Sequence, residues 1–166
     1  MENLLFLIAT LAIRISSKTL KKRSIGYTGC SVMLDTNAAI TYSESDNGEH
    51  LYMSTFNSGA VTYGFVLLDL KNKITNLSEA EYLLGDLMLD LKKASDIQHS
   101  YGLEGGIKHL ISQSVSGIID YWQDKEGIDW KIKGWTDGNC MAVLYVKNIN
   151  SASVKKQDFF LDCIRF

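Results

Sequence analysis

The stretch from Ile128 to Asn148 constrains the fold of this 166-residue chain more than any other part of its sequence. Residues 128–132 alternate apolar and charged side chains, which is the period of a half-buried strand. Residues 136–139 (TDGN) have the composition of a turn, and residues 140–146 then form an almost wholly apolar run. The stretch therefore predicts a β-hairpin whose second strand is covered on both faces of a sheet.

Upstream, short apolar runs separated by turn residues predict a second β-rich region. The expected strands are residues 27–34, 38–45, 49–56 and 60–70. A three-residue loop with Gly48 in the left-handed region pairs Glu44 with His50 and Tyr42 with Tyr52, both favourable cross-strand pairs. A two-residue turn would instead set two like charges against each other, so we expect the longer loop.

A helix is expected over residues 78–93, where apolar side chains recur at helical spacing. Ser78 and Glu81 match the capping box that often begins a helix. Residues 95–106 contain three glycines, and we expect a loop there.

The segment 107–123 fits both the helical and the strand period. We expect a helix at its start that passes to a strand near residues 115–123. A closing helix is predicted over residues 151–165, capped by Ser151 or Ser153. Its expected core side consists of Phe159, Phe160, Cys163 and Ile164.

Residues 1–24 form a separate N-terminal segment, followed by a single α+β domain over residues 25–166. The apolar run 4–13 is too short to span a bilayer, which needs about 20 residues. Three interpretations remain open: a degenerate export signal, a short helix packed on the domain, or a membrane-surface anchor formed by residues 4–23 with their basic flank. The first favours an extracytoplasmic location, in the periplasm or secreted; the second favours the cytoplasm.

The three cysteines, Cys30, Cys140 and Cys163, contain no C-x-x-C pair and lie in apolar contexts. Small buried hydrophobes are the favoured interpretation, although one bridge between two of them is compatible with an exported protein. The three histidines lie in separate expected elements, so the sequence predicts no zinc site. A hydrolase would need a Cys/His or Asp/His site assembled in space, for example around Cys30 or Cys140.

Other signals for chemistry are weak. Residues 102–106 are glycine-rich but lack the lysine of a phosphate-binding loop. Residues 46–49 and 137–139 carry oxygen ligands without the spacing of a calcium loop, and hairpin turns explain both. The net charge of −2 gives no reason to expect nucleic-acid binding. We expect no catalytic residue, no metal and no cofactor.

Trp135 is out of phase with Trp130, which puts it on the same strand face as Lys131 and Lys133. A tryptophan beside two lysines is typical of a partner-contact patch, and a helix covering Trp135 is the competing interpretation. We add two residues of the upstream hairpin to these candidates. The candidate partner-contact residues are Trp135, Lys131, Lys133, Tyr52 and His50.

The chain also resembles the Mog1/PsbP-like family over roughly residues 25–166. Residues 26–34 (GYTGCSVML) are similar to the first strand of that family, and residues 77–82 (LSEAEY) to its step from strands into a helix. Residues 144–146 and the ending 159–166 (FFLDCIRF) are similar to its last strand and helix. Two positions depart from the pattern: Asp35 stands at a usual proline and Cys163 at a usual serine.

The resemblance implies an α/β/α sandwich with a mainly antiparallel central sheet. It also implies a non-enzymatic accessory protein that works by binding another protein. Together with the export-like start, it leads us to expect a protein-binding module of the bacterial cell envelope. A spatially assembled hydrolase site and a membrane-surface module using residues 4–23 are the alternatives.

Overall fold

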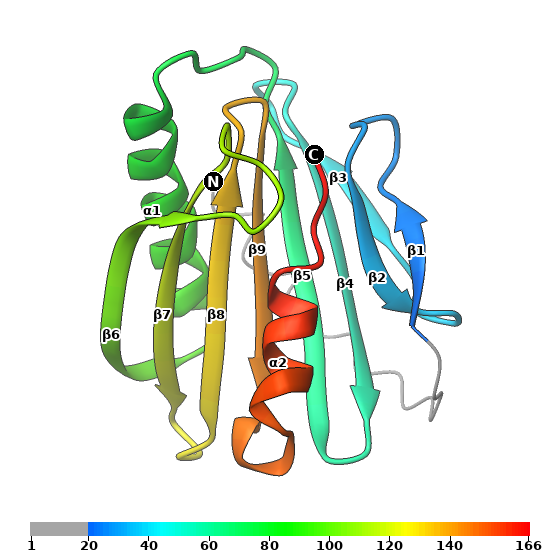
Figure 1. The fold of residues 1–166 in the computed structure, drawn as a ribbon, viewed down its shortest axis with the longest axis vertical. Helices are drawn as coiled ribbons and strands as arrows, with labels where there is room; N and C mark the ends of the chain where they lie inside the picture. Colours follow the sequence, from blue (N-terminus) through cyan, green and yellow to red (C-terminus); the bar gives the residue numbers. More distant parts are fainter. Residues whose placement is uncertain (1–19) are drawn as a thin grey trace.

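The computed structural model describes residues 20–166 (Figure 1). This part of the chain contains nine β-strands, two α-helices and one short 3₁₀ helix. In order, they are β1 (Leu20–Ser24), β2 (Ser31–Asp35), β3 (Thr41–Glu44), β4 (His50–Ser58), β5 (Val61–Asp69), α1 (Leu77–Ala94), β6 (Ile97–Lys108), β7 (Ser116–Asp124), β8 (Asp129–Thr136), β9 (Cys140–Lys147), η1 (Ile149–Ser151) and α2 (Val154–Leu161).

Seven strands form one antiparallel sheet in the order β3-β4-β5-β9-β8-β7-β6, and β1 pairs with β2 in a separate hairpin. The predicted central hairpin is confirmed as β8 and β9, and five consecutive residues at the start of β9 are buried. A strand in the middle of the sheet has no solvent-facing side, which explains its almost unbroken apolar run. These elements confirm an α+β protein with a mainly antiparallel sheet.

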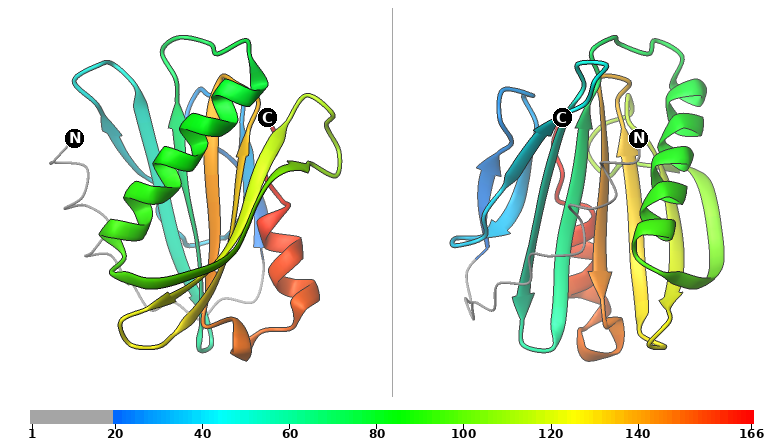
Figure 2. Two further views of the ribbon diagram at one scale, coloured as in Figure 1. Left: turned by 90° about the vertical axis from the view of Figure 1, so that its left-hand side faces the viewer. Right: turned by 180° about the vertical axis from the view of Figure 1, so that it is seen from behind.

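The two faces of the sheet are covered by different elements (Figures 1 and 2). On one face, α1 places Leu84, Met88 and Leu91 in a core cluster with residues of β7, β8 and β9. On the other face, α2 and the β1–β2 hairpin contribute Phe160 and Leu34 to a second core cluster. The sheet therefore separates two apolar cores, each closed by its own layer.

The β3–β4 hairpin has the predicted register. Glu44 pairs with His50 and Tyr42 with Tyr52, and Gly48 adopts a φ of 77°. A φ in the left-handed region suits glycine, which lacks the Cβ that makes this conformation costly. Cross-strand chemistry was therefore sufficient to fix this part of the sheet.

The helix predicted over residues 78–93 is confirmed as α1, but its predicted capping box is wrong. The side-chain oxygen of Asn76 accepts hydrogen bonds from two backbone N–H groups of the first turn, including that of Ser78. The Glu81 carboxylate instead accepts hydrogen bonds from the Gly106 N–H and the Ser116 hydroxyl. A residue expected to cap the helix therefore joins α1 to β6 and β7.

The expected loop over residues 95–106 is also wrong, because β6 runs through this segment. Its register against β7 shifts at three places, and Gly102 and Gly106 adopt φ values of 86° and 69°. Positive φ is typical of bulged strands, where an extra residue bends the chain. The glycines thus accompany an irregular edge strand rather than a loop.

The helix expected at the start of residues 107–123 does not form. Residues 107–108 end β6, and a turn region leads into β7, which confirms the strand expected near residues 115–123. The closing helix is shorter than predicted, since α2 ends at Leu161. Ser153 caps it as expected, but Phe159 is exposed rather than part of the core.

The first strand, β1, lies within the segment 1–24 that we separated from the domain. It pairs with β2 along all five of its residues. Lys21 and Lys22, part of the predicted basic flank, are exposed on this strand. The apolar run 4–13 lies outside the described residues.

Candidate functional site

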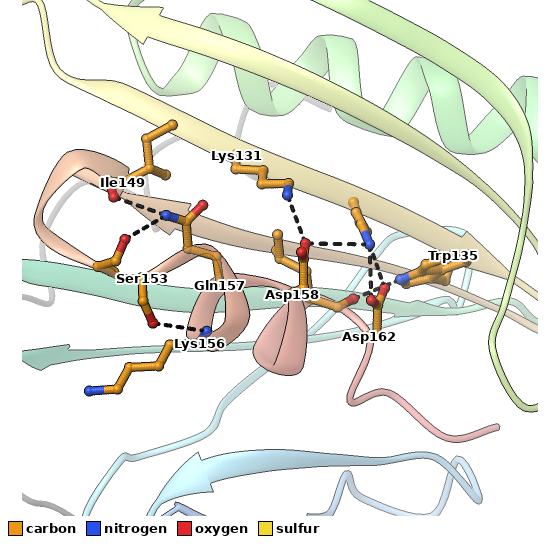
Figure 3. Close-up of polar contacts among 11 residues, drawn as sticks. Lys131, Trp135, Ile149, Ser153, Lys156, Gln157, Asp158 and Asp162 are labelled. Atoms are coloured by element: carbon orange, nitrogen blue, oxygen red, sulfur yellow. Dashed lines mark hydrogen bonds and ion pairs between the residues drawn. The ribbon is translucent and has the colours of Figure 1, made fainter.

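Trp135, the centre of the predicted partner-contact patch, lies beneath α2 (Figure 3). Its side chain is only 2% exposed, and its indole Nε1 donates a hydrogen bond of 2.8 Å to the Leu161 carbonyl oxygen. The competing interpretation, that a helix covers this tryptophan, is the arrangement seen in the structure.

The two lysines beside Trp135 contact carboxylates of α2 and of the residue that follows it; Figure 3 labels Lys131 and both aspartates. Lys131 Nζ lies 2.7 Å from Asp158 Oδ1, and Lys133 Nζ lies 2.8 Å from Asp162 Oδ1. Burial opposes the charge of Lys131, but its contacts with Asp158 and Tyr121 together outweigh burial and raise its pKa above the usual value. The three predicted contact residues on β8 therefore contact α2 and the residue after it, within the same chain.

The remaining two candidates, His50 and Tyr52, lie on β4, which two strands, β5 and β9, separate from β8. Tyr52 is buried, with 8% of its surface exposed. His50 Nδ1 lies 3.6 Å from Asp69 Oδ2, and its ring packs edge-on against Tyr42. The five candidates thus share one face of the sheet but do not form one contiguous site.

His50 belongs to a cluster with Asp69, Cys140 and Cys30 at the end of β5 and the start of β9. Strand pairing sets Asp69 between its neighbours, opposite His50 on β4 and opposite Cys140 on β9. The Cys140 thiol lies 3.5 Å from Asp69 Oδ1. The sequence allowed one bridge between two of the three cysteines, but that Cys30 and Cys140 are neighbours depends on packing between distant segments.

The arrangement of Cys140, Asp69 and His50 does not suit catalysis by a thiol nucleophile. A thiol nucleophile is activated by a neighbouring base, usually an imidazole. Here the Asp69 carboxylate separates the Cys140 thiol from the His50 imidazole, and the pKa of Cys140 is raised by its contact with Cys30 and by burial. This arrangement favours a protonated Cys140 rather than a thiolate nucleophile. Among residues 20–166, no group of three or more His, Cys, Asp or Glu side chains is placed to hold a metal ion.

A hollow of about 280 Å³ opens between the C-terminal end of α1 and strands β7 to β9. Trp122, Trp130 and Tyr145 contribute aromatic walls, and Lys147 lies at its side. The Lys147 ammonium is 2.8 Å from the buried Asp124 carboxylate, which also accepts a hydrogen bond from Trp130 Nε1. The charge of Lys147 is therefore compensated within the chain.

A different surface exposes large apolar side chains on β6 and the turn region that follows it. We call Tyr101, Leu103, Leu110 and Ile111 the β6 surface; they are 48%, 67%, 78% and 67% exposed, respectively. Sequence reasoning missed this surface because it assigned Leu103 to a loop and Leu110 to a helix face. The alternation of Tyr101 and Leu103 about Gly102 was the available signal for an edge strand.

Comparisons with family models, with curated proteins and with solved structures found no match to this chain. Within residues 20–166, neither α-helix has the length and apolar character that crossing a membrane requires.

Proposed function

We propose that this protein is a non-enzymatic accessory module that binds another protein through the β6 surface. The observation that carries the proposal is the exposure of four large apolar side chains on one edge strand and the turn after it. Grouped exposed apolar side chains mark interaction sites more often than scattered ones do. Exposing such side chains to water is unfavourable, and covering them with a partner removes that cost.

The backbone of β6 supports the same proposal. β6 lies at the end of the sheet, and within the described residues its strand pairing is with β7. An edge strand offers free backbone N–H and C=O groups to another chain. The register shifts near Glu104 interrupt a regular ladder, so we expect the partner to contact mainly the side chains of Leu103 and Leu110.

The proposed location is the bacterial cell envelope, and it rests on the export-like run 4–13. The resemblance to the Mog1/PsbP-like family supports a binding role for the domain. That family's α/β/α sandwich is the finer fold that we propose, supported by the position of α1 and α2 on opposite faces of the sheet.

Site-specific photo-crosslinking in the protein's own cells tests the proposal. A photoreactive phenylalanine replaces Leu103 or Leu110 in the full chain, and the matched control replaces Leu89, which is 50% exposed on α1. We expect a discrete crosslinked partner from the first two positions and none of that mass from position 89. Crosslinks of the same pattern from all three positions would contradict a binding site on β6.

A second experiment measures how much these side chains contribute to the affinity for the partner, which crosslinking does not report. The double substitution Leu103→Ser and Leu110→Ser is expected to weaken binding of the purified partner at least tenfold, since apolar anchors dominate interface energies. Leu89→Ser serves as the control. All three positions are exposed, so circular dichroism of each variant is expected to match that of the wild type.

A further inference from the structure

Cys30 and Cys140 approach each other although 109 residues separate them in the sequence. Both are 2% exposed and belong to the same core cluster. The two thiols lie close enough to interact with each other, and both are near the carboxylates of Asp69 and Asp137. Two buried thiols in contact are a pair in which oxidation can form a bond without a distant partner.

Local hydrogen bonds hold Cys30 in this position. Its backbone N–H donates to the Thr28 hydroxyl at 3.0 Å, and its carbonyl accepts from the Ile25 N–H at 2.9 Å. Cys140 begins β9, and its thiol lies 3.5 Å from Asp69 Oδ1. The turn before β2 and the first residue of β9 thus bring the two cysteines together in one core cluster.

We propose that Cys30 and Cys140 are a redox pair that forms a disulfide bond when the protein meets a small-molecule disulfide or a disulfide-exchanging protein. Cys163 takes no part in this pair. Its sulfur accepts a hydrogen bond from the Met33 N–H at 3.3 Å, and its surface is 6% exposed.

The two thiols have different parts in the exchange. The contact with Cys140 lowers the pKa of Cys30, whereas the same contact and burial raise that of Cys140. When the contacts of the β1–β2 hairpin open and expose Cys30, its thiolate attacks one sulfur of the external disulfide, forms a mixed disulfide and releases one external thiolate. Cys140 then loses its proton and attacks the Cys30 sulfur, which releases the second external thiolate. The protein loses two hydrogen atoms, and the external disulfide is reduced to two thiols.

The bond would join the β1–β2 hairpin to the main sheet. The hairpin is now connected to the C-terminal segment by two backbone hydrogen bonds of 2.9 Å between Ser31 and Arg165, in addition to core packing. A covalent connection from Cys30 to β9 would hold the hairpin when these contacts open. The inference stands apart from the proposed function, since Cys140 lies on the middle strand β9 and Cys30 lies outside the seven-stranded sheet, whereas β6 is its edge strand.

The test incubates the folded full chain with oxidised glutathione, blocks remaining thiols with N-ethylmaleimide in denaturant, and maps the peptides by mass spectrometry. We expect a product two hydrogen atoms lighter, a peptide pair linking Cys30 to Cys140, and one blocked thiol at Cys163. Cys163→Ser is the matched control and is expected to form the same bond. Cys30→Ser and Cys140→Ser are expected to abolish it.

Peptide mapping of the unsubstituted protein keeps the proposal testable even if a variant fails to fold. A link from either partner to Cys163, or equal blocking of all three thiols after oxidation, would overturn it. A glutathione adduct that persists on Cys30 would show that Cys140 does not complete the exchange, and would also overturn it. Reduction with dithiothreitol is expected to restore three blockable thiols.

Discussion

The Lys133 ammonium lies 2.8 Å from the Asp162 carboxylate, and the two side chains are only 14% and 13% exposed. This contact joins the middle of β8 to the residue that follows α2. A parallel contact, from Lys131 to Asp158, lies one turn earlier on the helix. The lysines that alternate along β8 therefore determine where α2 sits on the sheet.

Replacing Asp162 with asparagine leaves the Lys133 charge poorly compensated in a largely buried place. We expect the free energy of unfolding to fall by about 2 kcal/mol, less than the 3–5 kcal/mol typical of fully buried pairs, because Asp158 remains 3.8 Å away. Urea denaturation measures the change. Asp90→Asn is the control: Asp90 pairs with Lys93 on the surface of α1, and we expect a change below about 0.5 kcal/mol. Equal losses in both variants would contradict the argument.

The lowered pKa of the Asp124 carboxylate leads us to expect that the protein loses stability in acid. Burial works to raise its pKa, but hydrogen bonds from Lys147, the Ile128 N–H and Trp130 Nε1 outweigh burial and lower it. A pKa lowered by folding contributes stability above the unfolded value, about 4, which is lost as pH falls through the folded value. We expect Asp124→Asn to be less stable than the wild type at pH 7 and to differ from it less at pH 3.

Urea denaturation at several pH values measures this difference. Asp96→Asn is the matched control, because Asp96 is an exposed carboxylate paired with Lys125. The control is expected to keep the acid dependence of the wild type. An Asp124→Asn variant that loses stability in acid as steeply as the control would show that this carboxylate is not responsible.

The start of α1 offers a direct test of its cap. Asn76→Ala removes the oxygen that accepts two backbone hydrogen bonds, and we expect a loss of about 1 kcal/mol in the free energy of unfolding. Ser78→Ala is expected to change stability by less than about 0.5 kcal/mol, since Ser78 lies exposed inside the helix. A larger loss of stability for Ser78→Ala than for Asn76→Ala would instead support the capping box of Ser78 and Glu81 that the sequence predicts.

The sequence was most informative where local chemistry decides the structure. The β8–β9 hairpin and the pairing of Glu44 with His50 follow from periodicity, turn residues and cross-strand charge. The length and the main face of α1 follow from helical spacing. In each case residues close together in the chain contain the relevant information.

Predictions from the sequence were wrong or incomplete where contacts between distant segments determine the structure. Glycines in β6 suggested a loop, because only pairing with β7 shows that Gly102 and Gly106 accompany bulges. For Trp135 the sequence left two interpretations open, a partner-contact residue or one covered by a helix, and the packing of α2 decides between them. The neighbourhood of Cys30 and Cys140 depends on tertiary packing, and no spacing rule in the sequence reports it.

His109 predicts a second, milder pH dependence. Its ring is 6% exposed and perpendicular to Trp135, and within residues 20–166 its Nε2 has no hydrogen-bond partner. Burial and the nearby Arg165 lower its pKa below the usual 6.5, so stability is lost as pH falls below about 6.5. His109→Phe keeps the ring contact but loses the hydrogen bond that Nδ1 accepts from the Ile111 N–H, so we expect its stability relative to the wild type to be higher at pH 5 than at pH 8. Urea denaturation measures this, and the exposed His99→Gln is the control; an equal difference in both variants would exclude His109 as the cause.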